Sequence, residues 1–319
     1  MMKTLTRLAL AAFVATGAYA APAAAEYPEK PITVIIGFPP GGNVDITLRH
    51  AQPFLEKYLG TSLVVVSKPG AAAALAYTEL ANSPPDGYTI AMTSLPGGLG
   101  TQFGTERRYD VDSFEWIANF TEEPFTFFVH PDSPLQTMED MMEAARQDPG
   151  GISLAGSGSF GSPHLGLLVF QDLYDVEFTW VPMQGSAPMR TAVLGQHVDG
   201  GLTSVSVSAI MHVEGQVRVL GMMAPERWDL LPDVPTMAEL GYPINWTASR
   251  GLKAPAGTPP EIIDKLAEAS RKTMEDPEFL AILERERLLP KYLGPADYRK
   301  YVEEQNNMLK ALWEKKPWR

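Results

Sequence analysis

Apolar runs of strand length alternate with helical patterns along most of the chain. Such alternation is typical of α/β architecture with parallel sheets. Helical periodicity is clearest after residue 258, where three helices are expected, the last with its apolar face between residues 298 and 312. The strand candidates are 32–38, 63–67, 88–93, 116–120, 125–129, 152–155, 178–181, 201–205 and 217–222.

The first strand candidate ends at a Pro/Gly turn, and a helical pattern begins directly after it. Gly41 and Gly42 carry no Cβ atom, and Asn43 or Asp45 can cap the helix. Free backbone N–H groups at a helix N-terminus form a seat for an anion. An ordinary strand–turn–helix connection has the same pattern, so this motif alone leaves both interpretations open.

A second glycine-containing turn lies between the strand candidate 152–155 and a helical run at 165–174. Ser162 is the expected N-cap and Pro163 the first helical residue, and nearby serines add hydroxyl donors. Positions 156, 158 and 161 also match the dinucleotide fingerprint G-x-G-x-x-G. A dinucleotide domain starting after position 150 in an exported chain is the weaker interpretation, but it is the best case for an enzyme.

Composition restricts the function classes further. Residues 1–25 have the pattern of a secretory signal peptide, with Lys3 and Arg7 ahead of a short apolar core and alanine-rich cleavage options. An N-terminal membrane anchor is the alternative. Removing these residues takes the formal charge from -12 to -14, which disfavours binding to nucleic acid or anionic lipid through the overall field.

Several kinds of chemistry lack the residues they need. The chain has no cysteine, which excludes disulfides, thiolate metal sites and a lipidated cysteine anchor. The five histidines show no metal-ligand spacing, and no nucleophile-elbow, P-loop or H-E-x-x-H motif occurs. We therefore expect a protein of the bacterial periplasm, not lipid-anchored, that is not an enzyme and uses no cofactor and no metal.

Two segments, 119–129 and 246–254, are expected to cross between domains. The predicted organisation is a discontinuous first lobe, residues 26–122 plus 250–319, and a second lobe of residues 123–249. Two crossings form a hinge, and hinged lobes close around ligands. The carboxylate pair Glu122-Glu123 lies in the first crossing and is expected to be solvated.

Eight motifs occur in order along nearly the whole mature chain and together resemble one family. The similarity is to the substrate-binding proteins of tripartite tricarboxylate transporters, the Bug-type periplasmic receptors. The matching segments are 37–42 with Asp45, 68–71, 84–89, 159–164, 184–188, 195–199, 231–236 and 254–259.

The resemblance implies a two-lobed α/β fold of the periplasmic-binding-protein type (Venus flytrap, type II-like). It also implies capture of a small carboxylate, expected to be a dicarboxylate, a tricarboxylate or an aromatic acid, for integral-membrane permease subunits; a monomer is expected. By this resemblance, the residues expected to bind the carboxylate are Phe38, Pro39, Pro40, Gly41, Gly42, Asn43, Ser157, Gly158, Ser159, Phe160, Ser162 and His164. The rest of the pocket would be lined by Ala71, Ala72, Ser94, Gly185, Thr203 and Ser204.

The chain departs from the family pattern at four places. Residues 71–74 are all alanine where more glycine is usual, 200–204 lack an acid, and Pro53 lies inside a predicted helix, which it should kink or end near His50. The fourth departure is Arg250, where an aromatic residue is usual. Arg250 could hold a second, distal acid group of the ligand, or it could form an interdomain salt bridge.

Two competing functions remain open on the residues alone. One is an exported enzyme with a dinucleotide or ester substrate. The other is a receptor with the same clamp that reports to a sensor kinase instead of supplying a permease.

Overall fold

The first lobe is built on three parallel strands rich in β-branched residues. The computed structural model describes residues 27–104 and 108–318, so the predicted signal peptide lies outside the described residues. β1 (Ile32–Ile36) pairs in parallel with β2 (Leu63–Ser67) on one side and β3 (Thr89–Met92) on the other. Side chains of β1 and β3 are buried on both faces of the sheet, as expected for covered parallel strands, whereas the edge strand β2 leaves Val64 exposed.

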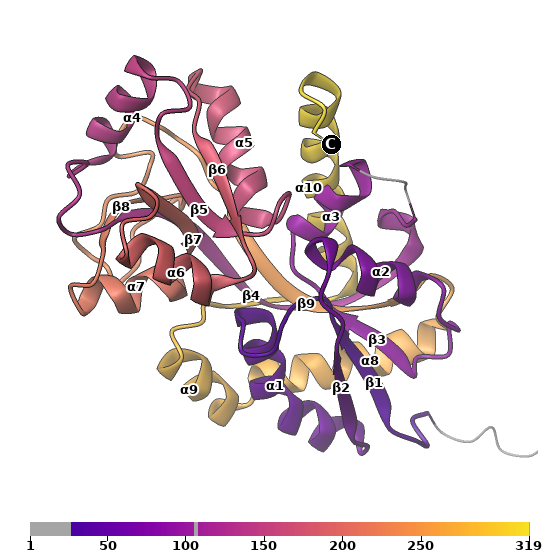
Figure 1. Cartoon of the computed structure of the whole chain (residues 1–319). Helices are drawn as coiled ribbons and strands as arrows, with labels where there is room; N and C mark the ends of the chain where they lie inside the picture. The colour runs from indigo at the N-terminus through magenta and orange to yellow at the C-terminus, as the bar shows by residue number, and fades with distance from the viewer. Residues whose placement is uncertain (1–26, 105–107, 319) are drawn as a thin grey trace, which may run out of the picture.

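Helices cover both faces of this sheet (Figure 1). One face packs on α1 (Asn43–Leu59), α8 (Pro260–Glu275) and α9 (Pro277–Arg285). The other packs on η1 (Ala71–Ala73), α2 (Ala74–Ala81), α3 (Gly97–Gly104), η2 (Val111–Ser113) and α10 (Pro295–Lys315).

Two long antiparallel strands join the lobes. β4 (Phe114–Val129) pairs with β9 (Thr247–Pro255) over its first part, and β9 continues the sheet of the first lobe by pairing with β3. The second part of β4 belongs to the other sheet. The two strand candidates 116–120 and 125–129 are therefore one continuous strand. The short β10 (Pro290–Leu293), which the sequence pattern did not predict, pairs with β4.

The second lobe contains a smaller mixed sheet. Its parallel strands are β5 (Ser153–Ser157), β6 (Thr179–Met183) and β7 (Gly200–Ser204). The second part of β4 is antiparallel to β7 and also pairs in antiparallel orientation with β8 (Arg218–Met222). The helices of this lobe are α4 (Met138–Gln147), α5 (Ser162–Tyr174), α6 (Ser186–Leu194) and α7 (Val205–Val213).

Of the two effects predicted for Pro53, an end of the helix near His50 is wrong. Helix α1 runs without interruption from Asn43 to Leu59, with Pro53 inside it. A proline in this position removes one backbone hydrogen bond and crowds the preceding turn. The apolar face on both sides of it, including Leu48, Phe54 and Leu55, is buried in the core, and this burial holds the helix together.

Among the described residues, no helix combines the length and the apolar character needed to cross a bilayer.

Candidate ligand cleft between the lobes

The first predicted loop leads from β1 into α1. Its glycine Gly41 has φ +79°, and its N–H donates to Asp45 Oδ2 at 2.9 Å. Neither Asn43 nor Asp45 caps the helix, contrary to the prediction: Gly42 is the N-cap, and no side chain caps the first turn. The first amides of α1 therefore keep their donor capacity, and the N-terminal end of the helix dipole adds to the attraction for an anion.

The side chain of Asn43 is directed at the other lobe. Its Nδ2 donates to Ser204 Oγ at 3.0 Å and to Ser206 Oγ at 3.1 Å, at the junction of β7 and α7. The predicted site residues Asn43 and Ser204 are thus brought together across the lobes. Ser206 was not predicted, although it lies two positions beyond a residue that was.

A strained alanine turn lies beside the first loop. Ala71, Ala72 and Ala73 have φ of +47°, +50° and +77°, a left-handed region that costs about 1 kcal/mol or more for each residue with a Cβ. Gly37 permits this approach, since a Cβ there would lie 2.3 Å from Ala73 Cβ. The turn faces the second lobe, because a Cβ on Gly158 would lie 3.9 Å from that of Ala72.

The second predicted loop leads from β5 into α5. Gly158 and Phe160 have φ of +69° and +57°. The N-cap is Gly161, not Ser162 as predicted, and no side chain caps the helix. Ser162 Oγ instead accepts the N–H of Gly97, the first residue of α3 in the other lobe, at 2.9 Å. The serine is therefore a contact between lobes, and the start of α5 remains rich in backbone donors.

The imidazole ring of His164 packs against this loop and stabilises it. Its Nδ1 accepts the N–H of Phe160 at 3.0 Å, and its ring stacks on Trp180 with centroids 4.9 Å apart and planes 7° apart. Burial lowers the pKa of His164 to about 4, because the charged ring would lose its hydration. At neutral pH the imidazole is uncharged and its Nδ1 is used within the loop.

The remaining predicted residues are distributed around these loops. Phe38 is half-buried and its carbonyl accepts from Ser67 Oγ at 2.6 Å, whereas Pro39 and Pro40 are exposed. The Ser94 N–H donates to the hydroxyl of Tyr77 at 3.0 Å. Further out are Ser157 at the end of β5, exposed Ser159, buried Thr203 on β7, and Gly185 with φ +111° before α6. Of these, Gly185 has open space around it, since a Cβ there would meet nothing within 4 Å.

A buried ion pair lies on the two crossing strands. Arg250 Nη1 is 3.2 Å from Glu123 Oε2, with side-chain exposures of 6% and 0%. The expectation that Glu123 is solvated was wrong: the alternation along β4 turns it inward while Glu122 stays half-buried. Ser206 Oγ donates to Glu123 Oε2 at 2.7 Å, so a polar chain runs from Arg250 through Glu123 and Ser206 to Asn43.

Unsatisfied polar atoms are concentrated at the same place. Of the eight buried side-chain N and O atoms without a hydrogen-bond partner in the described part of the chain, six belong to β4 and β9. Buried polar groups in native proteins almost always have a partner in protein, water or ligand. The six atoms are Asn119 Oδ1, Thr121 Oγ1, Glu123 Oε1, Ser249 Oγ, Arg250 Nε and Arg250 Nη1.

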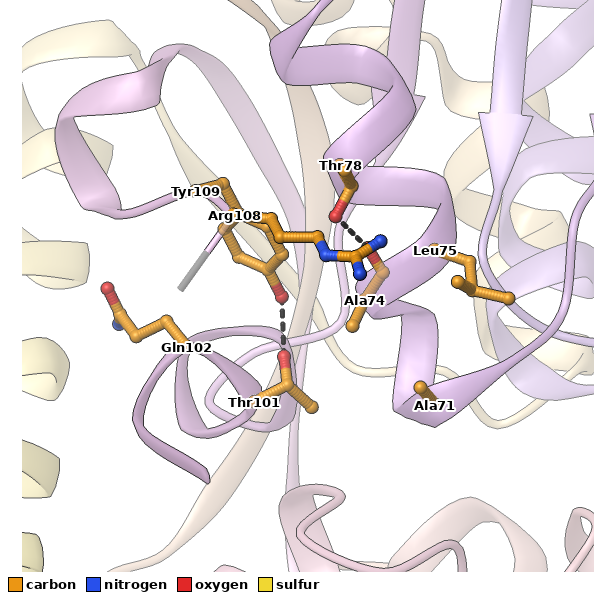
Figure 2. A pocket seen from close by; sticks show the side chains of 8 residues that line it. All are labelled: Ala71, Ala74, Leu75, Thr78, Thr101, Gln102, Arg108 and Tyr109. Atoms are coloured by element: carbon orange, nitrogen blue, oxygen red, sulfur yellow. Dashed lines mark hydrogen bonds between the residues drawn. The ribbon is translucent and has the colours of Figure 1, made fainter. Parts of the chain in front are cut away.

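A separate cavity of about 290 Å³ lies between α2 and α3 (Figure 2). Ala71 is its only lining residue that was predicted to contact ligand. The Thr101 Oγ1 and Tyr109 hydroxyl oxygens lie 2.5 Å apart at its wall. This cavity is therefore beside the alanine turn and outside the pair of helix N-termini. Its lining residues are Ala71, Ala74, Leu75, Thr78, Thr101, Gln102, Arg108 and Tyr109.

Two α/β lobes joined by antiparallel crossing strands, with a helix start in each lobe that contacts the other lobe, are the architecture of periplasmic binding proteins. The sequence profile described as "Tripartite tricarboxylate transporter family receptor" matches residues 47–317. The chain belongs to this family of solute-binding receptors, and the resemblance and the two-lobed fold expected from the sequence are confirmed.

Three known proteins illustrate the similarity. A Cupriavidus necator protein described as the UPF0065 protein in the gbd 5′ region is 32% identical, over 96% of this chain and 94% of its own. MatC from Rhodopseudomonas palustris, solved with bound malate, has a TM-score of 0.82 at 26% identity, with 90% of this chain and 99% of that chain covered. Rpa4515 from the same organism, solved with adipate, has a TM-score of 0.83 at 25% identity, with 91% and 98% covered.

Proposed function

We propose that this protein captures a small carboxylate in the periplasm and delivers it to the membrane permease subunits of a tripartite tricarboxylate-type transporter. The observation that carries the proposal is that both glycine loops lead into an uncapped helix and contact the opposite lobe: the start of α1 through Asn43 to Ser204, and the start of α5 through Ser162 to Gly97. Structural neighbours solved with malate and with adipate support the same ligand class.

The binding energy comes from oriented backbone amides. A carboxylate placed between the two helix starts accepts hydrogen bonds from N–H groups that have no intrahelical acceptor, and both helix dipoles favour its charge. Closure of the lobes brings Asn43 to Ser204 and Gly97 to Ser162, and it excludes water, which strengthens each of these bonds. We assign the lobe boundaries to the crossings at 122/123 and 249/250; along β4 the partner changes from β9 to β7 between Pro124 and Phe125, two residues beyond the first boundary.

Arg250 is proposed to hold a second acid group of the ligand. Its Nε is buried without a hydrogen-bond partner and its Nη1 has only the ion pair with Glu123, so the guanidinium has donors left for a carboxylate. Glu123 supplies only part of its surroundings, as an ion pair at 3.2 Å. A dicarboxylate would therefore bind with one end at the helix N-termini and the other near Arg250, against the repulsion of Glu123.

Isothermal titration with adipate and with its monomethyl ester tests this assignment. Arg250→Ala alone would leave Glu123 buried without its counter-charge, which costs about 3–5 kcal/mol in stability. The variant is therefore Arg250→Gln combined with Glu123→Gln, and Glu123→Gln alone is its matched control. The double variant should lose about tenfold in adipate affinity, or about 1.4 kcal/mol, and bind the monoester as before.

The control separates the two parts of the proposal. Glu123→Gln leaves Arg250 without its counter-charge and so also lowers stability. In the folded protein it retains Arg250 and removes a charge that repels the ligand, so its affinity for adipate should equal or exceed that of the unmodified protein. Equal adipate affinity in all three proteins would remove Arg250 from the site. If a wider panel of mono-, di- and tricarboxylates gives no binding and no rise in melting temperature, the carboxylate function itself fails.

A further inference from the structure

The last described residue of the chain, Trp318, lies against the serine-rich loop of the other lobe. Its ring is 6% exposed and stacks on Phe160, with centroids 6.2 Å apart and planes at 26°. The ring also lies perpendicular to that of Phe103 in α3, with centroids 6.1 Å apart, and its Nε1 donates to the carbonyl of Gly100 at 3.3 Å. A ring pair of this kind contributes beyond its buried area.

Trp318 is one end of a column of aromatic rings that passes through the loop. Phe160 lies 5.2 Å from the ring of His164, and His164 stacks on Trp180. Trp180 Nε1 donates to the carbonyl of Gly158 at 3.0 Å, and Phe160 donates its N–H to His164. The column therefore contacts the loop at both residues that have positive φ, Gly158 and Phe160.

Phe160 is the residue in this column whose conformation is hardest to maintain. A side chain with φ +57° persists only where its surroundings hold it. The backbone amide of Phe160 is held by His164, and its ring is covered by Trp318 from the C-terminal end of the chain. Without Trp318, one face of the ring would be left exposed to water.

A second contact places the end of α10 on the same helix that starts at the loop. Lys315 and Lys316 approach Asp172 of α5 at 2.6 and 3.0 Å. Both lysines are more than half exposed, so these ion pairs contribute little energy. They bring the chain end close to α5, and the packing of Trp318 supplies the specific contact.

We infer that Trp318 is a positioning residue for the ligand loop Ser157–His164, holding Phe160 in its left-handed conformation so that the amides at the start of α5 face the cleft. The positioning of the loop by Trp318 does not depend on the proposed function; only the carboxylate that the loop would bind rests on it. The chain end then controls affinity from the lobe opposite to the loop, without touching the ligand.

Hydrogen exchange of the protein without ligand tests the positioning role directly. In Trp318→Ala, the two hydrogen-bonded amides of the loop, those of Gly158 and Phe160, should exchange about tenfold faster than in the unmodified protein, because local opening becomes easier. Trp318→Phe keeps the stacked ring and should restore most of the protection. The matched control is Trp313→Leu, which removes another ring packed on Phe103, at 6.0 Å, and should leave loop exchange unchanged.

Titration with adipate adds the functional readout. Trp318→Ala should bind adipate about tenfold more weakly, Trp318→Phe within about twofold, and Trp313→Leu as the unmodified protein does. Loop exchange unchanged in Trp318→Ala overturns the inference, as does a loss of affinity shared equally by Trp313→Leu. If the unmodified protein binds no carboxylate, the proposed function fails, and the exchange measurement still decides the role of Trp318.

Discussion

The uncharged state of His164, next to the second loop, predicts how the stability of the fold depends on pH. His164 is buried against Trp180 and accepts the N–H of Phe160, and burial holds its pKa at about 4 against an ordinary value of 6.5. Between these two pH values His164 is protonated in the unfolded chain and unprotonated in the folded protein. Stability from this residue is therefore complete above pH 6.5 and is lost as the pH falls toward 4.

The size of the effect follows from the two pKa values. Each pH unit inside the window corresponds to about 1.4 kcal/mol for one proton. Because the window begins at 6.5, lowering the pH from 7 to 5 should reduce the free energy of unfolding by about 2 kcal/mol through His164 alone. The ring is half-buried, so this figure is an upper value.

Urea denaturation at pH 7, 6 and 5 measures this contribution. His164→Gln removes the titrating ring, so its free energy of unfolding should fall less over this range than that of the unmodified protein. Trp180→Leu removes the burying ring and should also flatten the curve, because the pKa of His164 then rises toward its ordinary value. Identical pH dependence in His164→Gln and the unmodified protein would refute the reasoning.

Three further changes have expected outcomes. Gly97→Ala would place a Cβ 2.6 Å from the amide nitrogen of Ser162 across the lobes; it should weaken ligand binding in titration calorimetry by separating α3 from α5. Gly37→Ala would place a Cβ 2.3 Å from Ala73 Cβ, and the overpacking should lower the free energy of unfolding by about 1–3 kcal/mol in urea titrations. Burial holds the pKa of Lys253 well below its ordinary value of 10.5, so the free energy of unfolding in urea titrations should rise as the pH is raised toward 10.5, and Lys253→Met should remove this rise.

Local patterns predicted the elements that depend on neighbouring residues. The strand 63–67 has the bounds that its β-branched run indicates, and both glycine turns lead from a strand into a helix. The segments expected to cross between domains, 119–129 and 246–254, overlap β4 and β9. These features follow from hydrophobic periodicity and turn residues, which act over a few positions.

Contacts between distant segments could not be predicted in this way. The position of Arg250 beside Glu123 depends on the register of β9 on β4, in which Thr121 faces Arg250. No local pattern fixes that register. The alternation of Glu122 and Glu123 along a strand was a usable signal, because consecutive strand residues point to opposite faces.

The caps and the chain end were missed for related physical reasons. Ser162 is a good N-cap by type, but its hydroxyl is engaged by Gly97 of the other lobe. Asn43 is similarly engaged by Ser204 and Ser206. The contact between Trp318 and Phe160 joins residues that are far apart in sequence, so only the tertiary structure could reveal it.

Backbone amide chemical shifts during a ligand titration test most directly whether both lobes grip one carboxylate. In ¹⁵N-labelled protein titrated with adipate, the amides of Gly42 and Asn43 in one lobe and of Ser159 and Gly161 in the other should shift together, with one common dissociation constant. The monomethyl ester should produce the same pattern through its single free carboxylate. Saturable binding that shifts the amides of only one loop, or of neither, would contradict the account.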